Sequence, residues 1–300
     1  GLGAGKKGAE LGPFALRIAC GQIGYDLFAR NDVETFINDH NYYATSDKYQ
    51  ADYIKQLVDF NELTCNAAAD AFNNYQKILM LTGDHSNAVG SVSGLKKAFP
   101  NAKIGVIWID AHADLHSPYS TPSQNFHGMP LAALCGVNNK QEKTANPPLE
   151  NIPQWERFKE IGGKNISPKI KPSDIVFIDI RDLEQPEWDL IKEHNIKYFA
   201  PIDRIKLGIN AIIDQSLEYH HDKDIIYITF DVDSLDPSIS RGTGTPVDGG
   251  LSVAEATTLL KAFYHHPKTK MLEVTEINPL IDNRNQMAMA AARILKAVGV

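Results

Sequence analysis

The stretch Ile104-Gly-Val-Ile-Trp-Ile109 runs directly into Asp110-Ala-His-Ala-Asp114. An unbroken apolar run of this length is typical of a strand that is buried on both faces of a sheet. In extended chain every second side chain lies on one face, so Asp110, His112 and Asp114 are expected to point the same way. The pattern predicts a buried strand whose end presents three polar side chains to one site.

The same design recurs in two other places. Ile225-Ile-Tyr-Ile-Thr-Phe230 runs into Asp231-Val-Asp-Ser-Leu-Asp-Pro237, again with carboxylates two residues apart. A third apolar run, Ile78–Leu81, ends in Gly83-Asp-His-Ser86, which places His85 just beyond a turn. We expect these to be three neighbouring strand ends that converge on one cleft. Because carboxylates buried without partners are strongly unfavourable, such a cluster predicts bound cations.

Apolar runs alternate with helical spacing along the whole chain, which predicts one α/β domain over residues 1–300 with a mainly parallel sheet and helices on both faces. Further strands are expected at Ile175–Ile180 and Met271–Ile277. The expected helices are Ala51–Tyr75, Asn87–Phe99, Trp188–His194, Ile205–Tyr219, Val253–His265 and Asn285–Val298. The irregular stretches 115–126 and 136–153 are longer than ordinary loops and so favour a functional role. Since the chain opens without Met, a first strand is expected to precede Gly1.

Bulk composition excludes several classes of protein. With 43% hydrophobic and 22% charged residues the chain is expected to bury a substantial core. A net charge of -7 argues against nucleic acid as a partner. No apolar run approaches the roughly 18 residues of a membrane-spanning helix. Three widely spaced cysteines indicate buried thiols rather than disulfides or a zinc site. We therefore expect a cytoplasmic protein.

The chemistry of the candidate ligands narrows the metal. Two imidazoles and four carboxylates without a thiolate suit Mn²⁺ better than zinc, and they come from His85, Asp110, His112, Asp114, Asp231 and Asp233. Two ions that share carboxylates can hold a water and lower its pKa, which makes hydroxide available as a nucleophile. No Gly-x-Ser-x-Gly elbow or activated cysteine supports covalent catalysis instead.

Taken together, the motifs resemble the signature set of the ureohydrolases, which comprise arginases, agmatinases and formimidoylglutamases. The resemblance rests on Gly83–Ser86, Asp110–Asp114, Asp231–Pro237 and Gly242-Thr-Gly-Thr-Pro-Val-Asp-Gly-Gly-Leu251, and it extends from Gly12-Pro-Phe-Ala-Leu-Arg17 to Glu276-Ile-Asn-Pro279. It implies a single α/β domain that hydrolyses a guanidino or amidine group with a hydroxide bridging two Mn²⁺ ions. It also implies self-association as a homotrimer or homohexamer.

Residue roles follow from the resemblance position by position. It implies one ion on His85, Asp110, Asp114 and Asp231, and the other on Asp110, His112, Asp231 and Asp233, so that Asp110 and Asp231 bridge. Glu276 is expected to pair with the substrate guanidinium, and His127 to shuttle a proton to the leaving amine. These two residues and Asp114 make up the predicted catalytic set.

Among the ureohydrolases, the loop Ser117–Gly128 is most similar to that of arginases, which bind an α-amino acid. Thr121, Ser123 and Asn125 would contact the α-carboxylate, and Glu184 with Glu187 would face the α-ammonium. Thr245 and His116 complete the expected substrate contacts. The predicted reaction is hydrolysis of L-arginine to L-ornithine and urea.

Three positions depart from the arginase pattern. His116 stands where Asn is usual, Glu184 where Asp is usual, and Thr82 where the first Gly of the Gly-Gly-Asp-His loop is usual. Because the first two touch the substrate head group, an agmatinase, guanidinobutyrase or formimidoylglutamase remains open, as does a non-catalytic member of the family.

Two other functions have less support. A two-metal phosphoesterase would need a basic phosphate clamp, which the ligand segments do not offer. A phosphate loop at Gly1–Gly8 would need a preceding strand and a Ser or Thr after the Lys.

Overall fold

The computed structural model describes residues 1–37, 54–141 and 143–300. Within these ranges six strands form one sheet in the order β1-β6-β5-β2-β3-β4. The strands are β1 (Ile78–Leu81), β2 (Ile104–Ile109), β3 (Ile175–Ile178), β4 (Lys197–Phe199), β5 (Ile225–Asp231) and β6 (Thr269–Thr275). Every pairing is parallel, so the predicted parallel α/β fold is confirmed.

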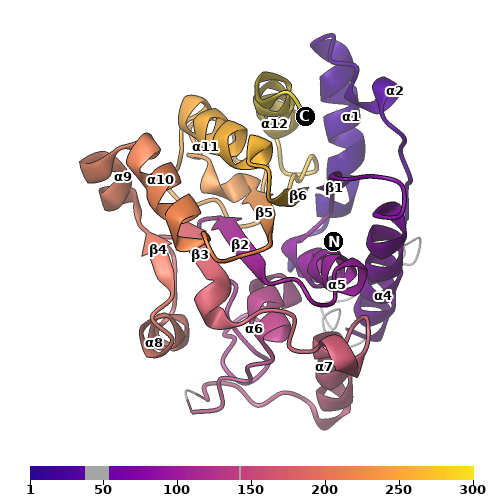
Figure 1. Cartoon of the computed structure of the whole chain (residues 1–300), viewed down its shortest axis with the longest axis vertical. Helices are drawn as coiled ribbons and strands as arrows, with labels where there is room; N and C mark the ends of the chain where they lie inside the picture. Colours follow the sequence, from indigo (N-terminus) through magenta and orange to yellow (C-terminus); the bar gives the residue numbers. More distant parts are fainter. Residues whose placement is uncertain (38–53, 142) are drawn as a thin grey trace.

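Helices cover both faces of this sheet (Figure 1). The described helices are α1 (Gly12–Gln22), α2 (Leu27–Arg30), α4 (Ile54–Ala71), α5 (Ala88–Ala98), α6 (Pro130–Cys135), α7 (Ile152–Lys159), α8 (Gln185–Glu193), α9 (Pro201–Leu207), α10 (Ile209–Tyr219), α11 (Val253–His265) and α12 (Gln286–Val298). Side chains of α4 to α7 belong to one apolar core, and those of α1 and α10 to α12 belong to another.

Strand β2 shows why its sequence is apolar at nearly every position. Val106 and Trp108 enter the core on the α4 side of the sheet, whereas Ile107 and Ile109 enter the core on the opposite side. All six residues of the strand are buried. A central parallel strand that is covered on both faces has no position for a solvated side chain, so polar residues appear only where the strand ends.

The strand order corrects one prediction. The ends of β1, β5 and β2 were expected to be neighbours, but β6 lies between β1 and β5. The register still aligns the carboxyl ends, because Leu81 pairs with Val274, Val274 with Phe230, and Phe230 with Ile109. The intervening strand therefore brings Glu276, one residue past its end, into the same cleft.

Several predicted boundaries were wrong, and the backbone explains them. The helix expected over 205–219 is broken into α9 and α10 at Gly208, whose φ is +79°. The strands expected to end at Ile180 and Ile277 end earlier, since Asp179 and Glu276 have φ of +73° and +65°, outside the extended region. Strand β6 also begins two residues before the predicted start.

Two predicted helices differ at their ends as well. Helix α8 begins three residues before the prediction, because the Glu187 carboxylate caps the backbone N–H of Glu184. Helix α4 ends at Ala71 instead of Tyr75, and residues 51–53 of that prediction lie outside the described residues. The sequence interpretation missed α1, α2, α6, α7 and β4, and it also missed the first four residues of α9.

The structure bears on the predictions about the cysteines and about membrane-spanning helices. Cys20, Cys65 and Cys135 are buried and form no disulfide, as predicted. In the part of the chain that the structure describes, no helix has the length and apolar character needed to cross a membrane.

Candidate metal centre and substrate pocket

Three strand ends bring the six predicted ligands together, and we call them the strand-end cluster: His85, Asp110, His112, Asp114, Asp231 and Asp233. Three carboxylate oxygens surround Nδ1 of His85. Oδ2 of Asp110 lies 3.0 Å from this nitrogen, and Oδ2 of Asp114 and of Asp231 each lie 3.1 Å from it. All four side chains are buried. One nitrogen and three oxygens therefore converge on a single position.

A second group forms around His112 and shares Asp110 with the first. Nδ1 of His112 lies 3.1 Å from Oδ2 of Asp233 and 3.4 Å from Oδ1 of Asp110. Asp110 thus offers one carboxylate oxygen to each group. Asp231 directs Oδ2 to the first group, while its Oδ1 accepts the backbone N–H of Asp233. The arrangement gives two adjacent positions with one common carboxylate.

These residues fit divalent ions. In octahedral coordination, metal–ligand bonds of about 2.1–2.3 Å meet at right angles, so neighbouring ligand atoms lie about 3.0–3.2 Å apart. The separations between Nδ1 of His85 and the three carboxylate oxygens match this value. Nδ1 of His85 is fully buried, and within the described residues it makes no hydrogen bond. Such an orphaned nitrogen inside a ring of carboxylates is the environment of a metal ligand.

The electrostatics of the strand-end cluster also favour bound cations. Burial, with the nearby charges of Asp233 and Asp110, raises the pKa of Asp231 well above its ordinary value. Burial and the Asp110 charge raise the pKa of Asp114 to about 6. Burial alone would lower the pKa of His85, but its three carboxylate partners raise it well above normal. The carboxylates thus draw positive charge into the cluster, and cations would supply that charge.

The predicted catalytic pair lies beside this cluster. Nδ1 of His127 is 2.9 Å from Oε1 of Glu276, and the same oxygen accepts the backbone N–H of His85 at 3.0 Å. Burial would lower the pKa of His127, but the Glu276 carboxylate raises it to about 9. The sequence had assigned these residues separate roles; the structure shows that they contact each other.

Three other predicted residues form a second group, which we call the head-group cluster: His116, Glu184 and Glu187. Nε2 of His116 lies 2.9 Å from Oε2 of Glu184 and 3.4 Å from Oε2 of Glu187. Oε1 of Glu187 accepts the backbone N–H of Leu115 at 3.1 Å. Burial raises the pKa of Glu187 well above its usual value. The cluster therefore joins the loop after β2 to the beginning of α8.

The remaining predicted contacts lie in loops around the cleft. The Thr121 hydroxyl accepts the N–H of Gln124 at 3.0 Å, and the Ser123 hydroxyl accepts the N–H of Asn125 at 3.2 Å. The Thr245 hydroxyl instead donates to Oδ2 of Asp233 at 3.0 Å, so it contacts the strand-end cluster directly.

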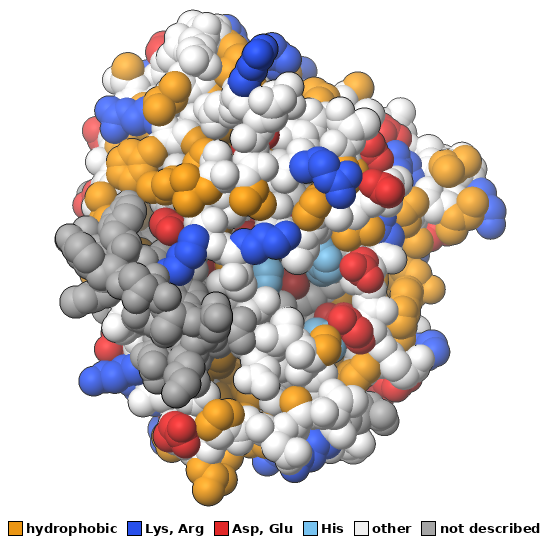
Figure 2. Space-filling model, turned by 180° about the vertical axis from the view of Figure 1, so that it is seen from behind, with side chains coloured by type: hydrophobic (Ala, Val, Ile, Leu, Met, Phe, Trp, Pro, Cys, Tyr) orange, Lys and Arg blue, Asp and Glu red, His pale blue; other side chains and the backbone are white. Residues whose placement is uncertain are grey.

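The glycine-rich beginning of the chain lies against the same cleft. The carbonyl of Gly3 accepts the N–H of His127 at 3.1 Å, and Nζ of Lys6 donates to the carbonyl of Gly244 at 2.7 Å. Figure 2 shows this face of the molecule, with histidine and acidic side chains in a hollow and basic side chains at its rim. The backbone N–H of Gly3 donates to Oδ2 of Asp84 at 3.0 Å, so the segment lines an acidic cleft.

Comparison with known proteins identifies the family of this site. A family model described as "Arginase family" matches residues 1–299. The arginase of Staphylococcus aureus (strain MSSA476) is 35% identical over 301 residues, covering 98% of this chain and 92% of its own. The chain belongs to the arginase family. Membership supports a metal-dependent hydrolase of the ureohydrolase type.

Solved arginases have the same fold as this arginase-family chain. The crystal structure of Bacillus subtilis arginase has a TM-score of 0.79 at 28% identity, with 99% of this chain and 94% of that chain covered. Entamoeba histolytica arginase, solved in complex with L-ornithine, has a TM-score of 0.84 at 26% identity, with 100% and 95% covered.

Two residues of the arginase-family site escaped the sequence interpretation. Nε1 of Trp108 donates to Oδ2 of Asp110 at 2.9 Å, and its indole stacks on His85 with centroids 4.1 Å apart. The Thr229 hydroxyl lies 2.8 Å from Nε2 of His85. Each stands two residues before a predicted ligand on the same strand face, so the period-two argument already contained the signal.

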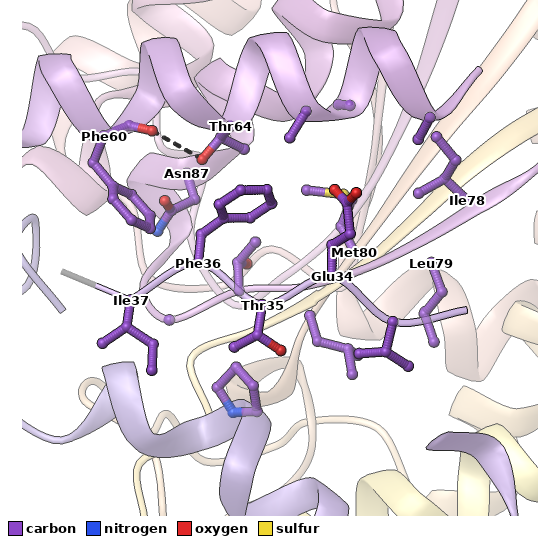
Figure 3. Close-up of a pocket in the computed structure, with 18 of the residues that line it drawn as sticks. Glu34, Thr35, Phe36, Ile37, Phe60, Thr64, Ile78, Leu79, Met80 and Asn87 are labelled. Atoms are coloured by element: carbon purple, nitrogen blue, oxygen red, sulfur yellow. Dashed lines mark hydrogen bonds between the residues drawn. The ribbon is translucent and has the colours of Figure 1, made fainter. Parts of the chain in front are cut away.

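A cavity of 710 Å³ opens elsewhere in the arginase-family fold, between residues 31–37, α4 and the edge strand β1 (Figure 3). Figure 3 shows Phe36 beside Phe60 and Met80, and the Thr64 hydroxyl donates to the carbonyl of Phe60. No acid–histidine group lies within its described lining. Within the described residues the acid–histidine groups lie in the strand-end cleft and not in this cavity.

Proposed function

We propose that this chain is a manganese-dependent arginase that hydrolyses L-arginine to L-ornithine and urea. The observation that carries the proposal is the shared carboxylate of Asp110, whose two oxygens face two adjacent ligand groups. In the proposal His85, Asp110, Asp114 and Asp231 hold one Mn²⁺, and Asp110, His112, Asp231 and Asp233 hold the other. The hard donor set favours manganese over zinc.

When bound, the two ions would lower the pKa of a shared water and so supply a hydroxide nucleophile near neutral pH. The protein's own residues would orient the substrate and move protons. Oε1 of Glu276 is held by His85 and His127, which leaves Oε2 available to pair with a guanidinium. Because its pKa is raised to about 9, His127 holds a proton at neutral pH that it can give to the leaving amine.

The substrate class rests on the loops around the cleft. Glu184 and Glu187 would bind an α-ammonium, while Thr121, Ser123 and Asn125 would bind an α-carboxylate. The Entamoeba histolytica arginase solved with L-ornithine supports a head group of this kind, since ornithine carries both charges. Thr245 would act through Asp233, to which it donates.

A substrate panel tests the proposal. The manganese-loaded protein is assayed with L-arginine, agmatine, 4-guanidinobutyrate and N-formimidoylglutamate, by release of urea or formamide. We expect the largest kcat/KM with L-arginine. Preference for another member of the panel would overturn the arginase proposal in favour of a sister enzyme. Bound manganese without turnover of any panel member would indicate a non-catalytic relative.

The same panel repeated with His116→Asn examines the departure from the arginase pattern. If His116 contacts the head group, this change alters KM for L-arginine, while the bound manganese stays the same. An unchanged KM would contradict the proposed contact.

Three wider predictions complete the proposal. Residues 1–300 form one domain, the chain works in the cytoplasm, and it assembles as a homotrimer or homohexamer. Sedimentation of the manganese-loaded protein distinguishes these assemblies from a monomer.

A further inference from the structure

The head-group cluster contains the donor atoms of a metal site, although it lies outside the six proposed ligands. One atom each from His116, Glu184 and Glu187 lie within 4.8 Å of one another. The side chains of His116 and Glu187 are only 7% and 3% exposed, whereas Glu184 is 52% exposed. The cluster is therefore a buried pair of donors with a third donor at the open side, by which an ion could enter.

Neighbouring groups hold these donors in place. Nδ1 of His116 lies 3.2 Å from the Ser120 hydroxyl, which accepts the N–H of Ser117 at 3.1 Å. With Nδ1 engaged there, Nε2 faces the two carboxylates. A histidine ligand is commonly oriented by a hydrogen bond from its second ring nitrogen in this way.

The Glu187 carboxylate is also held in place by the protein. Both oxygens of Glu187 accept backbone N–H groups, from Leu115 at 3.1 Å and from Glu184 at 3.2 Å. Because Glu184 and Glu187 flank the first turn of α8, their relative position follows the helix. Nε2 of His116 is within hydrogen-bond distance of Oε2 of Glu184 at 2.9 Å, and Oε2 of Glu187 lies on its other side, so a divalent cation can take the place of the proton among these three atoms.

The spacing suits a small tetrahedral ion. Zinc bonds of about 2.0–2.1 Å place ligand atoms about 3.3–3.4 Å apart in a tetrahedron. Nε2 of His116 lies 3.4 Å from Oε2 of Glu187, which equals such an edge, and 2.9 Å from Oε2 of Glu184, whose half-exposed side chain can move outward to reach it. One imidazole and two carboxylates leave the fourth position for water, and a site with so few protein ligands suits the four-coordinate geometry that zinc prefers.

We propose that His116, Glu184 and Glu187 form a third divalent-cation site that takes Zn²⁺, separate from the two positions of the strand-end cluster. A bound zinc ion occupies the place where the proposed function puts the substrate ammonium, so it competes with substrate. This competition rests on the proposed function, but the binding of zinc does not.

Equilibrium dialysis with metal analysis tests the binding. Manganese-loaded protein is dialysed against excess manganese with increasing Zn²⁺, and both metals are counted per chain. We expect a total of three ions in the wild-type protein. His116→Asn should bind the additional zinc at least about tenfold more weakly and keep a total of two ions. The matched control His221→Asn removes an exposed histidine on a turn and should keep three.

Two results would overturn the proposal: a wild-type total that stays at two ions, or a third ion that persists in His116→Asn. If His116→Asn fails to fold, Glu184→Gln replaces it, because this half-exposed side chain can lose its charge with little change in packing. Far-UV circular dichroism of each variant confirms that it is folded.

Steady-state kinetics test the competition separately. Zinc should raise KM for L-arginine and leave kcat unchanged in the wild-type enzyme, with no such effect in His116→Asn. Inhibition that lowers kcat alone would overturn the overlap with the head group. An enzyme that binds three ions but does not hydrolyse L-arginine would refute the proposed function and leave the zinc site supported.

Discussion

The two acid–histidine clusters of the cleft differ in what holds them. The strand-end cluster follows β1, β2 and β5, whose last residues are aligned by the register of a buried sheet. The head-group cluster joins the irregular loop after β2 to the first turn of α8. The first is therefore fixed by many backbone hydrogen bonds and two apolar cores, and the second by a few local contacts.

This difference matches where the chain departs from the arginase pattern. Of the three departures, His116 and Glu184 belong to the head-group cluster. Thr82 directly follows β1, but all six residues of the strand-end cluster fit the pattern. Loops on a rigid scaffold can change residues without disturbing the core, so specificity varies there more readily than chemistry. Variants of the two clusters should therefore have different consequences.

The largest effect is expected from Asp110→Asn, because Asp110 is the residue that both ligand groups share. Turnover should fall by more than about 100-fold, since loss of even an outer partner of a metal site costs 10- to 100-fold. Bound manganese should drop from two ions to one or fewer per chain, measured by metal analysis after gel filtration. Asp214→Asn on the exposed face of α10 is the control. Two tightly held ions in Asp110→Asn would contradict the shared role.

A smaller effect is expected from Thr229→Val, which removes the hydroxyl 2.8 Å from Nε2 of His85 and keeps the shape of the side chain. Without this partner the imidazole loses its fixed orientation, so manganese affinity should fall by about 10- to 100-fold. Competition with a calibrated chelator measures the affinity. The control Thr258→Val, on the exposed face of α11, should leave it unchanged. Equal affinities for the two variants would show that the sheet alone positions His85.

The same contrast explains which parts of the fold and of the site could be predicted from the sequence. Period-two spacing at the ends of apolar runs is local, so it predicted five of the strand-end residues and could have found Trp108 and Thr229. The sixth, His85, was predicted from the turn that follows its apolar run. Strand order is not local: nothing within β1 or β5 indicates that β6 separates them. The contact between His127 and Glu276 joins residues 149 positions apart and depends on that order. Likewise, the break at Gly208 requires the backbone angle, which helical spacing does not reveal.

Within the head-group region, Ser123→Ala should have a moderate effect that depends on the substrate. If its hydroxyl binds an α-carboxylate, kcat/KM should fall by about 3- to 10-fold for L-arginine and for 5-guanidinopentanoate, whose carboxylates stand at the same distance from the guanidinium. Agmatine has none and should be hydrolysed at the wild-type rate, which provides an internal control. Manganese content should not change. A loss shared equally by all three substrates would mean that Ser123 supports the loop and does not contact the head group.

The smallest effect, and one of opposite sign, is expected from Gln124→Gly in the same loop. Gln124 has φ of +61° and an exposed side chain, so its backbone is in a region that glycine adopts without steric cost. Glycine relieves this strain, although its greater freedom in the unfolded chain offsets part of the gain. The net effect should stabilise the protein by about 0.5–1 kcal/mol. Thermal unfolding of the manganese-loaded protein measures it. Gln215→Gly, within helix α10, should instead destabilise by about 0.5–1 kcal/mol. If both substitutions lower the melting temperature equally, the backbone at Gln124 is not strained. The loop would then differ from the strand ends in its residues and not in its backbone strain.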